Sequence, residues 1–136
     1  MSKILLAEDG LITAFHLKKL FEKYDHEVIA HVTKGEEVFD QFEKIQPDLL
    51  LLDIMLEGYM NGVEAAQKIR ATSEVPIIFM SALTDDETLE EINKISNCTT
   101  HNKPFEEDSL IKEVEKMLAK KCFYISPTSD YSMIDL

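Results

Sequence analysis

Acidic, hydroxyl and basic side chains follow four short apolar runs of this 136-residue sequence. Glu8 and Asp9 come directly after KILLA, and Asp53 comes directly after LLLL. Ser81 follows PIIFM, and Lys103 follows a weaker apolar stretch. Two carboxylates roughly 4 Å apart repel by about 4 kcal/mol at an effective dielectric of about 20, so three that converge are either partly protonated or hold a cation. Donors that are all oxygen favour a hard divalent ion, above all Mg²⁺, which binds one or two carboxylates together with phosphate oxygens.

With such an ion bound, the Asp53 carboxylate is a candidate nucleophile toward phosphorus and would form an aspartyl phosphate. A transferring phosphoryl group spreads negative charge over its oxygens, and neutralising that charge is most of the catalysis. The Lys103 ammonium and the Ser81 hydroxyl are the groups expected to contact these oxygens, while the small Ala82 leaves space for the incoming group. A carboxylate that follows four leucines is also costly to bury without a partner.

The segments between these residues alternate between strand and helix patterns. Short apolar runs predict strands at residues 3–7, 27–32, 49–53, 76–80 and 98–101. Apolar side chains at helical spacing predict helices near residues 11–24, 34–45, 63–69, 89–95 and 106–121. Strict alternation implies an α/β fold, a single doubly wound five-stranded parallel sheet with helices on both faces. Because ligands bind at the carboxyl ends of the strands in such sheets, the candidate residues should meet at one edge.

The helix patterns also predict which side chains point toward the sheet. Leu11, Leu17 and Phe21 share one face of the first helix, and Leu89 and Ile92 share one face of the fourth. His16, His26 and His31 have no spacing typical of a metal or catalytic site, so we expect them on the surface or at an edge.

Composition places the chain in one domain, which we expect at residues 1–121, followed by a tail or truncated linker at 122–136. A net charge of −12 repels phosphate backbones and anionic lipid, so direct binding of nucleic acid or membrane is not expected. Cys98 and Cys122 lack metal-ligand or disulfide spacing, which favours reduced thiols in a cytoplasmic protein.

Four segments resemble the receiver domain of two-component response regulators, over roughly residues 3–121. They are KILLAEDG, LLLLDIMLEGYMNGVEAAQKIR, PIIFMSAL and NKPF, in the family's order and at similar separations. The resemblance implies a flavodoxin-like fold in which Asp53 is the phosphoacceptor. Asp9, Asp53 and the backbone carbonyl of Met55 would bind Mg²⁺ directly, and Glu8 would act mainly through water. Ser81 and Lys103 would contact the phosphoryl group, and the bond between Lys103 and Pro104 is often cis in the family.

The resemblance also implies a signalling module rather than an enzyme with an external substrate. A histidine kinase or histidine phosphotransfer domain would donate the phosphoryl group, and the domain would slowly dephosphorylate itself. The phosphorylated domain would bind a downstream protein through a changed surface around its last two helices, or it would form a phosphorylation-dependent dimer.

Two features depart from the family pattern. Receivers usually carry an aromatic switch residue three positions before the lysine, where this sequence has Thr100, with His101 next to it. The loop after Asp53 is one residue longer than the common form and carries Glu57.

Two alternatives therefore stay open. One is a degenerate receiver that acts as a phosphate-independent scaffold. The other is a hydrolase with an aspartyl-phosphate intermediate, although Met55 holds the position of its general acid.

Overall fold

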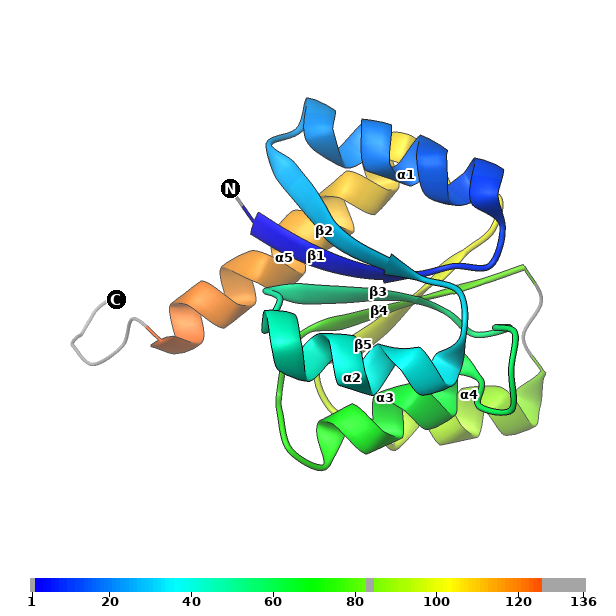
Figure 1. Cartoon of the computed structure of the whole chain (residues 1–136). Helices are drawn as coiled ribbons and strands as arrows, with labels where there is room; N and C mark the ends of the chain where they lie inside the picture. The colour runs from blue at the N-terminus through cyan, green and yellow to red at the C-terminus, as the bar shows by residue number, and fades with distance from the viewer. Residues whose placement is uncertain (1, 83–84, 126–136) are drawn as a thin grey trace.

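The computed structural model describes residues 2–82 and 85–125, with side chains described through residue 119. It contains a single five-stranded sheet covered by helices on both faces (Figure 1). The strands are β1 (Ser2–Ala7), β2 (His26–Val32), β3 (Leu49–Asp53), β4 (Ile77–Ser81) and β5 (Cys98–Asn102). The helices are α1 (Leu11–Lys23), α2 (Gly35–Ile45), α3 (Gly62–Arg70), α4 (Asp86–Asn93) and α5 (Glu107–Ile125). All four strand pairs are parallel, in the order β2-β1-β3-β4-β5, which confirms the predicted fold class.

The strand order reverses between β1 and β3, which lie side by side although α1, β2 and α2 separate them in the chain. Ala7 at the end of β1 pairs with Leu52, so the residues that follow them, Glu8 and Asp53, reach the edge at the same level. Asp53 pairs in turn with Met80, one residue before Ser81. This is the topological switch point, where an open α/β sheet leaves a crevice between its outgoing connections.

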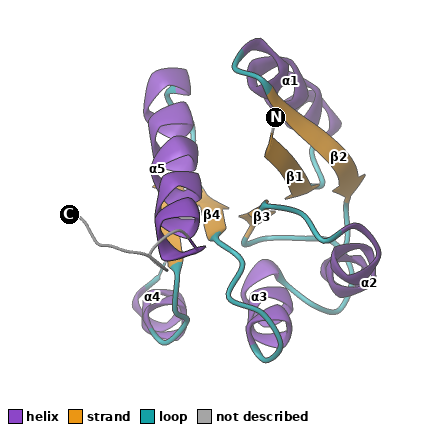
Figure 2. Ribbon diagram, turned by 90° about the vertical axis from the view of Figure 1, so that its left-hand side faces the viewer, coloured by secondary structure: helices purple, strands orange, loops and turns teal. Residues whose placement is uncertain are grey.

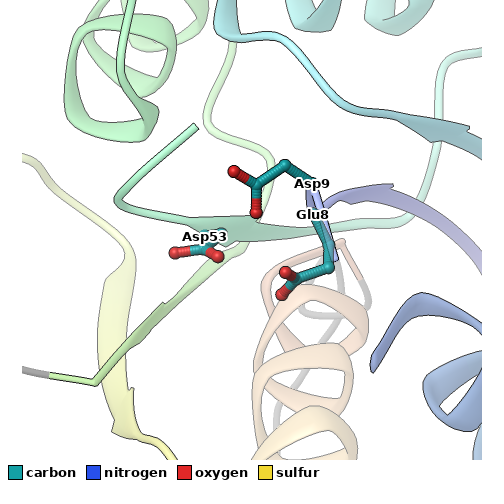
Figure 3. A group of neighbouring side chains, drawn as sticks. All are labelled: Glu8, Asp9 and Asp53. Atoms are coloured by element: carbon teal, nitrogen blue, oxygen red, sulfur yellow. The ribbon is translucent and has the colours of Figure 1, made fainter. Parts of the chain in front are cut away.

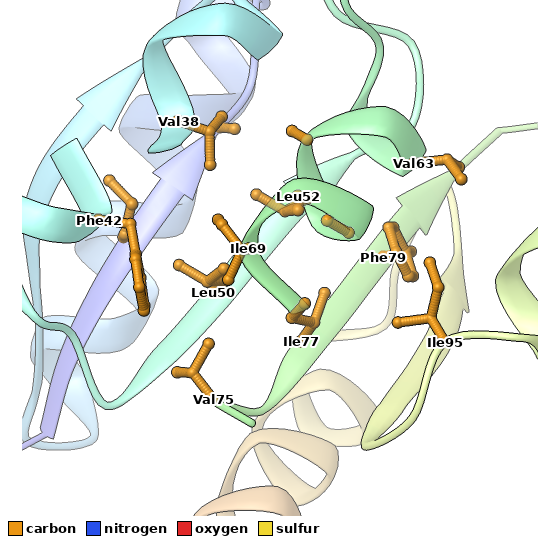
Figure 4. Close-up of a cluster of buried hydrophobic side chains, with 14 of the residues drawn as sticks. Val38, Phe42, Leu50, Leu52, Val63, Ile69, Val75, Ile77, Phe79 and Ile95 are labelled. Carbon is orange, nitrogen blue, oxygen red and sulfur yellow. The ribbon is translucent and has the colours of Figure 1, made fainter. Parts of the chain in front are cut away.

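Two apolar layers hold the helices to the sheet, because the buried strands alternate their side chains between the faces. Leu50, Leu52 and Phe79 pack with residues of α2, α3 and α4 (Figure 4). Leu49 and Leu51 pack on the opposite face with residues of α1 and α5, the two helices that cover that face (Figure 2). All residues of β3 and β4 are buried, whereas those of the edge strand β5 are partly exposed, as expected for a central and an outer strand.

Two predicted details of packing are wrong. Leu11 begins α1 and is 71% exposed, and Leu89 of α4 is 38% exposed. His26 lies in the edge strand β2, in line with the predicted edge position, but it is 8% exposed and packs edge-on against Phe21. Periodicity predicts which face of a helix a residue lies on, but not where along the helix that face contacts the sheet. Leu11 lies in the first turn of α1, where its side chain is still exposed.

The C-terminal helix is longer than predicted, since α5 continues through residue 125. It therefore crosses the expected domain boundary at residue 121, and the rest of the expected tail, residues 126–136, lies outside the described residues. Cys98 is a half-buried free thiol, and burial raises its pKa. The side chain of Cys122 lies outside the described part.

Arg70, the last residue of α3, binds three loop carbonyls near the starts of β4 and β5, at the end of the sheet opposite to Asp53. Its guanidinium donates to the carbonyls of Ser96, Ser73 and Asn97 at 3.0, 2.6 and 3.3 Å. Arg70→Ala is expected to lower the free energy of unfolding by about 2 kcal/mol, because these acceptors lose a charged donor. Urea unfolding checks this, with Lys44→Ala on α2 as an exposed control expected to change stability by no more than about 0.5 kcal/mol. Equal effects of the two substitutions would contradict the prediction.

Candidate functional site

Three carboxylates meet at the switch point of the sheet. Glu8 and Asp9 follow β1, and Asp53 is the last residue of β3. One carboxylate oxygen from each of them lies within 4.8 Å of the other two (Figure 3). The strand ends thus bring together residues that are more than forty positions apart in the sequence, as the sequence predicts.

Lys103 reaches this cluster from the loop between β5 and α5. Its Nζ lies 2.9 Å from Glu8 Oε1 and 2.7 Å from Asp53 Oδ2. Its backbone N–H donates to the carbonyl of Ser81 at 2.7 Å, which fastens this loop to the end of β4. The peptide bond between Lys103 and Pro104 is cis.

The charges of the cluster do not balance. Three carboxylates and one ammonium carry a net charge of −2 when all are ionised, while Glu8 is 2% and Asp53 5% exposed. Burial raises the pKa of Glu8, against the hydrogen bonds that it accepts from Lys103 and Gly10. Burial lowers the pKa of Lys103, but its bonds to Asp53 and Glu8 outweigh burial and raise that pKa overall. The site is thus electrostatically suited to a divalent cation.

The loop after Asp53 is held against its carboxylate and its backbone. The Met55 N–H donates to Asp53 Oδ1 at 3.0 Å, and the Met55 side chain is 72% exposed. Gly62, the first residue of α3, donates its N–H to the carbonyl of Ile54 at 2.9 Å. A Cβ at Gly62 would overlap the carbonyl oxygen of Asp53, so only glycine permits this approach.

Gly62→Ala is expected to lower the free energy of unfolding by about 3 kcal/mol, because backbone rather than a flexible side chain must move to admit the methyl group. Its neighbour Asn61 provides the control, since its side chain caps α3 by accepting from the Glu64 N–H at 2.9 Å. Asn61→Ala should cost about 1 kcal/mol. Urea unfolding of both variants measures the difference, and equal losses would show that the approach to Asp53 is not tight.

The match to known proteins covers most of the chain. Residues 4–115 match the family model of the response regulator receiver domain. This chain is a receiver domain of the response regulator family. The solved signal receiver domain of a modulated diguanylate cyclase from Desulfovibrio desulfuricans G20 superimposes on it with a TM-score of 0.85 at 31% identity, covering 91% of this chain and 98% of that one.

Curated relatives of this receiver domain differ in length. It is 35% identical over 118 residues to the regulatory protein VanRB of Enterococcus faecalis, covering 87% of this chain and 53% of that protein. It is 27% identical over 117 residues to the chemotaxis protein CheY of Listeria monocytogenes, covering 85% of this chain and 98% of that protein. The receiver domain spans only 25%, 53% and 54% of the length of the first three curated relatives that it matches.

The remaining predicted site residues of the receiver domain lie around the same edge. Ser81, the last residue of β4, is 2% exposed, and Ala82 next to it is exposed. Thr100 and His101 are half-buried in the edge strand β5, where Thr100 pairs with Phe79. Thr100 holds the position of the usual aromatic switch residue, and a switch role for Thr100 or His101 stays a prediction.

Sequence reasoning missed one residue at the site, His31, whose ring nitrogen Nε2 lies 2.7 Å from the carbonyl oxygen of Glu8. No motif marks it. Of residues 2–82 and 85–125, none belongs to a helix with both the length and the apolar character needed to cross a membrane.

Proposed function

We propose that this receiver domain accepts a phosphoryl group on Asp53 in a Mg²⁺-dependent reaction, and that the phosphorylated form switches the binding of a partner. The observation that carries the proposal is the pairing of Lys103 Nζ with Asp53 Oδ2 at 2.7 Å beside two further carboxylates. An ammonium held against the acceptor carboxylate is in place to receive the negative charge of an incoming phosphoryl group.

The donor set fits Mg²⁺, because the clustered atoms are all oxygens and their net charge of −2 matches a divalent ion. Asp9, Asp53 and the backbone carbonyl of Met55 would hold the ion, with Glu8 acting through water. Hydrogen bonds from Lys103 at 2.9 Å and from the Gly10 N–H at 3.0 Å, one to each of its two oxygens, hold the Glu8 carboxylate in place beside the ion. Bound Mg²⁺ would neutralise charge on the phosphoryl oxygens.

In the proposed step, an Asp53 carboxylate oxygen forms a bond to phosphorus as the bond from phosphorus to the donor nitrogen breaks. The leaving imidazole keeps the electron pair of the broken bond. Lys103 moves its hydrogen bond from Asp53 Oδ2 to a phosphoryl oxygen, and the Ser81 hydroxyl and the backbone at Ala82 bind the other oxygens. Water then slowly hydrolyses the phosphoryl group on Asp53, which returns the domain to its starting state. The domain would thus act as a signalling module and not as an enzyme with an external substrate.

The phosphoryl donor would be the phosphohistidine of a histidine kinase or of a histidine phosphotransfer domain, in the cytoplasm. Exposed apolar side chains near the site support a protein donor, since such patches mark interaction surfaces. Among the described residues, five of the six large apolar side chains that are exposed belong to the start of α1 or to the loop after Asp53: Leu11, Ile12, Phe15, Met55 and Tyr59. Binding of a downstream protein or of a second phosphorylated copy would follow the switch.

A small phosphodonor tests this function without knowledge of the kinase. The receiver domain is incubated with acetyl phosphate with and without Mg²⁺, and its intact mass is measured. We expect one phosphoryl adduct that forms only with Mg²⁺ and then decays. No adduct under either condition would favour the phosphate-independent scaffold, for which Thr100 in place of the aromatic residue is the supporting observation. Continuous turnover of added phosphomonoesters would instead favour the hydrolase.

A further inference from the structure

We propose that His31 is a positioning residue that orients Asp9 for Mg²⁺, by donating a hydrogen bond to the carbonyl between Glu8 and Asp9. The inference rests on the metal site of the proposed function. His31 Nε2 lies 2.7 Å from the Glu8 carbonyl oxygen. A carbonyl oxygen only accepts, so Nε2 must carry the proton of this bond.

An irregularity in β2 puts His31 in reach of Glu8. Ile4 of β1 pairs with Val28, but the next residue, Leu5, pairs with Ala30, so Ile29 is an extra residue in the ladder. Such a bulge changes which face of the sheet the later side chains occupy.

The apolar layers show this change of face. Val28 packs in the layer with α1 and α5, whereas Ala30, two residues later, packs in the opposite layer. In a regular strand the two side chains would share one face. The bulge therefore pairs His31 with Leu6, which faces α1 and α5, and lets Val32 pair with Ala7 in the other layer.

The His31 side chain stands in for a backbone donor that the sheet does not supply. In a parallel strand pair, each residue bonds to two residues of the neighbouring strand. Its N–H donates to the carbonyl of one of them, and its C=O accepts from the N–H of the residue two positions after that one. The Glu8 N–H donates to the Val32 carbonyl at 3.0 Å, so the expected donor to the Glu8 carbonyl is the N–H of Lys34. However, β2 ends at Val32, and Lys34 forms the N-cap of α2 and a bridge to Glu57.

The bond matters because Glu8 is fixed at its other polar atoms. Its N–H is held by β2, and its carboxylate accepts from Lys103 at 2.9 Å and from the Gly10 N–H at 3.0 Å. The carbonyl held by His31 belongs to the peptide unit that leads into Asp9, whose side chain is exposed. Rotation of this peptide plane would turn the Asp9 carboxylate away from Asp53, and groups that orient metal ligands typically contribute tenfold or more to affinity.

The test compares three substitutions of His31 by isothermal titration with Mg²⁺ and by thermal unfolding without metal. Glutamine places its amide N–H near the position of Nε2, asparagine is too short to do so, and phenylalanine keeps the ring but has no donor. We expect roughly tenfold weaker Mg²⁺ binding for His31→Asn and His31→Phe, and affinity close to wild type for His31→Gln. Rescue by glutamine separates the hydrogen bond from a general loss of packing.

Each outcome decides the inference. Equal affinity in all variants, or an equal loss in all three including His31→Gln, would overturn the role of the hydrogen bond and leave the metal site intact. A wild-type domain that binds no Mg²⁺ would overturn both the inference and the proposed function. Asp53→Asn serves as the reference for lost binding at the site, since it removes one of the three carboxylates.

Discussion

Asp53→Asn is expected to abolish the phosphoryl adduct formed with acetyl phosphate and Mg²⁺. An amide oxygen is a poor nucleophile and carries no charge for a metal, while its shape fits the space of the carboxylate. Lys103 keeps its bond to Glu8 at 2.9 Å, so we expect a change in the free energy of unfolding of about 1 kcal/mol or less. Intact mass measures the adduct, and thermal unfolding shows that the variant is folded.

The matched control is Asp40→Asn, the same chemical change at an exposed position of α2. It should leave the adduct unaltered. A folded Asp53→Asn domain that still gained a phosphoryl group would place the acceptor elsewhere, with the buried hydroxyl of Ser81 on the neighbouring strand as one candidate.

Lys103→Met is expected to slow phosphorylation by roughly 100-fold or more, because a donor aimed at the developing charge is lost. The same substitution leaves Glu8 and Asp53 buried without their shared ammonium. Breaking such a pair should lower the free energy of unfolding without metal by about 4 kcal/mol. The rate of phosphorylation is obtained by stopping the reaction at successive times and measuring the phosphorylated fraction by intact mass. Urea unfolding gives the free energy of unfolding.

In Lys103→Met, we expect the affinity for Mg²⁺ to rise although the rate of phosphorylation falls. The ammonium competes with the cation for Asp53 Oδ2, where it sits at 2.7 Å, so its removal should strengthen Mg²⁺ binding and let the ion restore part of the lost stability. Lys94→Met is the control, because Lys94 is 73% exposed and pairs only weakly with Glu91 on the surface. Weaker Mg²⁺ binding in Lys103→Met would contradict this view of the site.

The sheet and most of the site could be predicted from the sequence because both follow from local patterns. Four apolar residues before Asp53 identify a central strand, and parallel strands must end at a common edge, so Asp53 has to meet Glu8 and Lys103 there. The topology, rather than any single motif, brings these residues together.

Contacts between residues that only the folded chain brings together could not be predicted in this way. The bulge at Ile29 shifts the side chains after it to the opposite face, and no residue type in β2 marks it. His31 does lie in an edge strand, as predicted, but its contact with the site depends on this bulge and could not be predicted. Arg70 likewise bonds to carbonyls more than twenty residues away, which only the folded chain brings near.

The most direct test of the account is to locate the phosphoryl group in the chain. The domain is treated with acetyl phosphate and Mg²⁺ and then with borohydride, which reduces an acyl phosphate to an alcohol, and its peptides are sequenced by mass spectrometry. We expect homoserine at position 53 only, and none when Mg²⁺ is withheld. Modification at another residue, or at residue 53 regardless of Mg²⁺, would contradict the claim that the three carboxylates and Lys103 form one metal-dependent phosphoacceptor site.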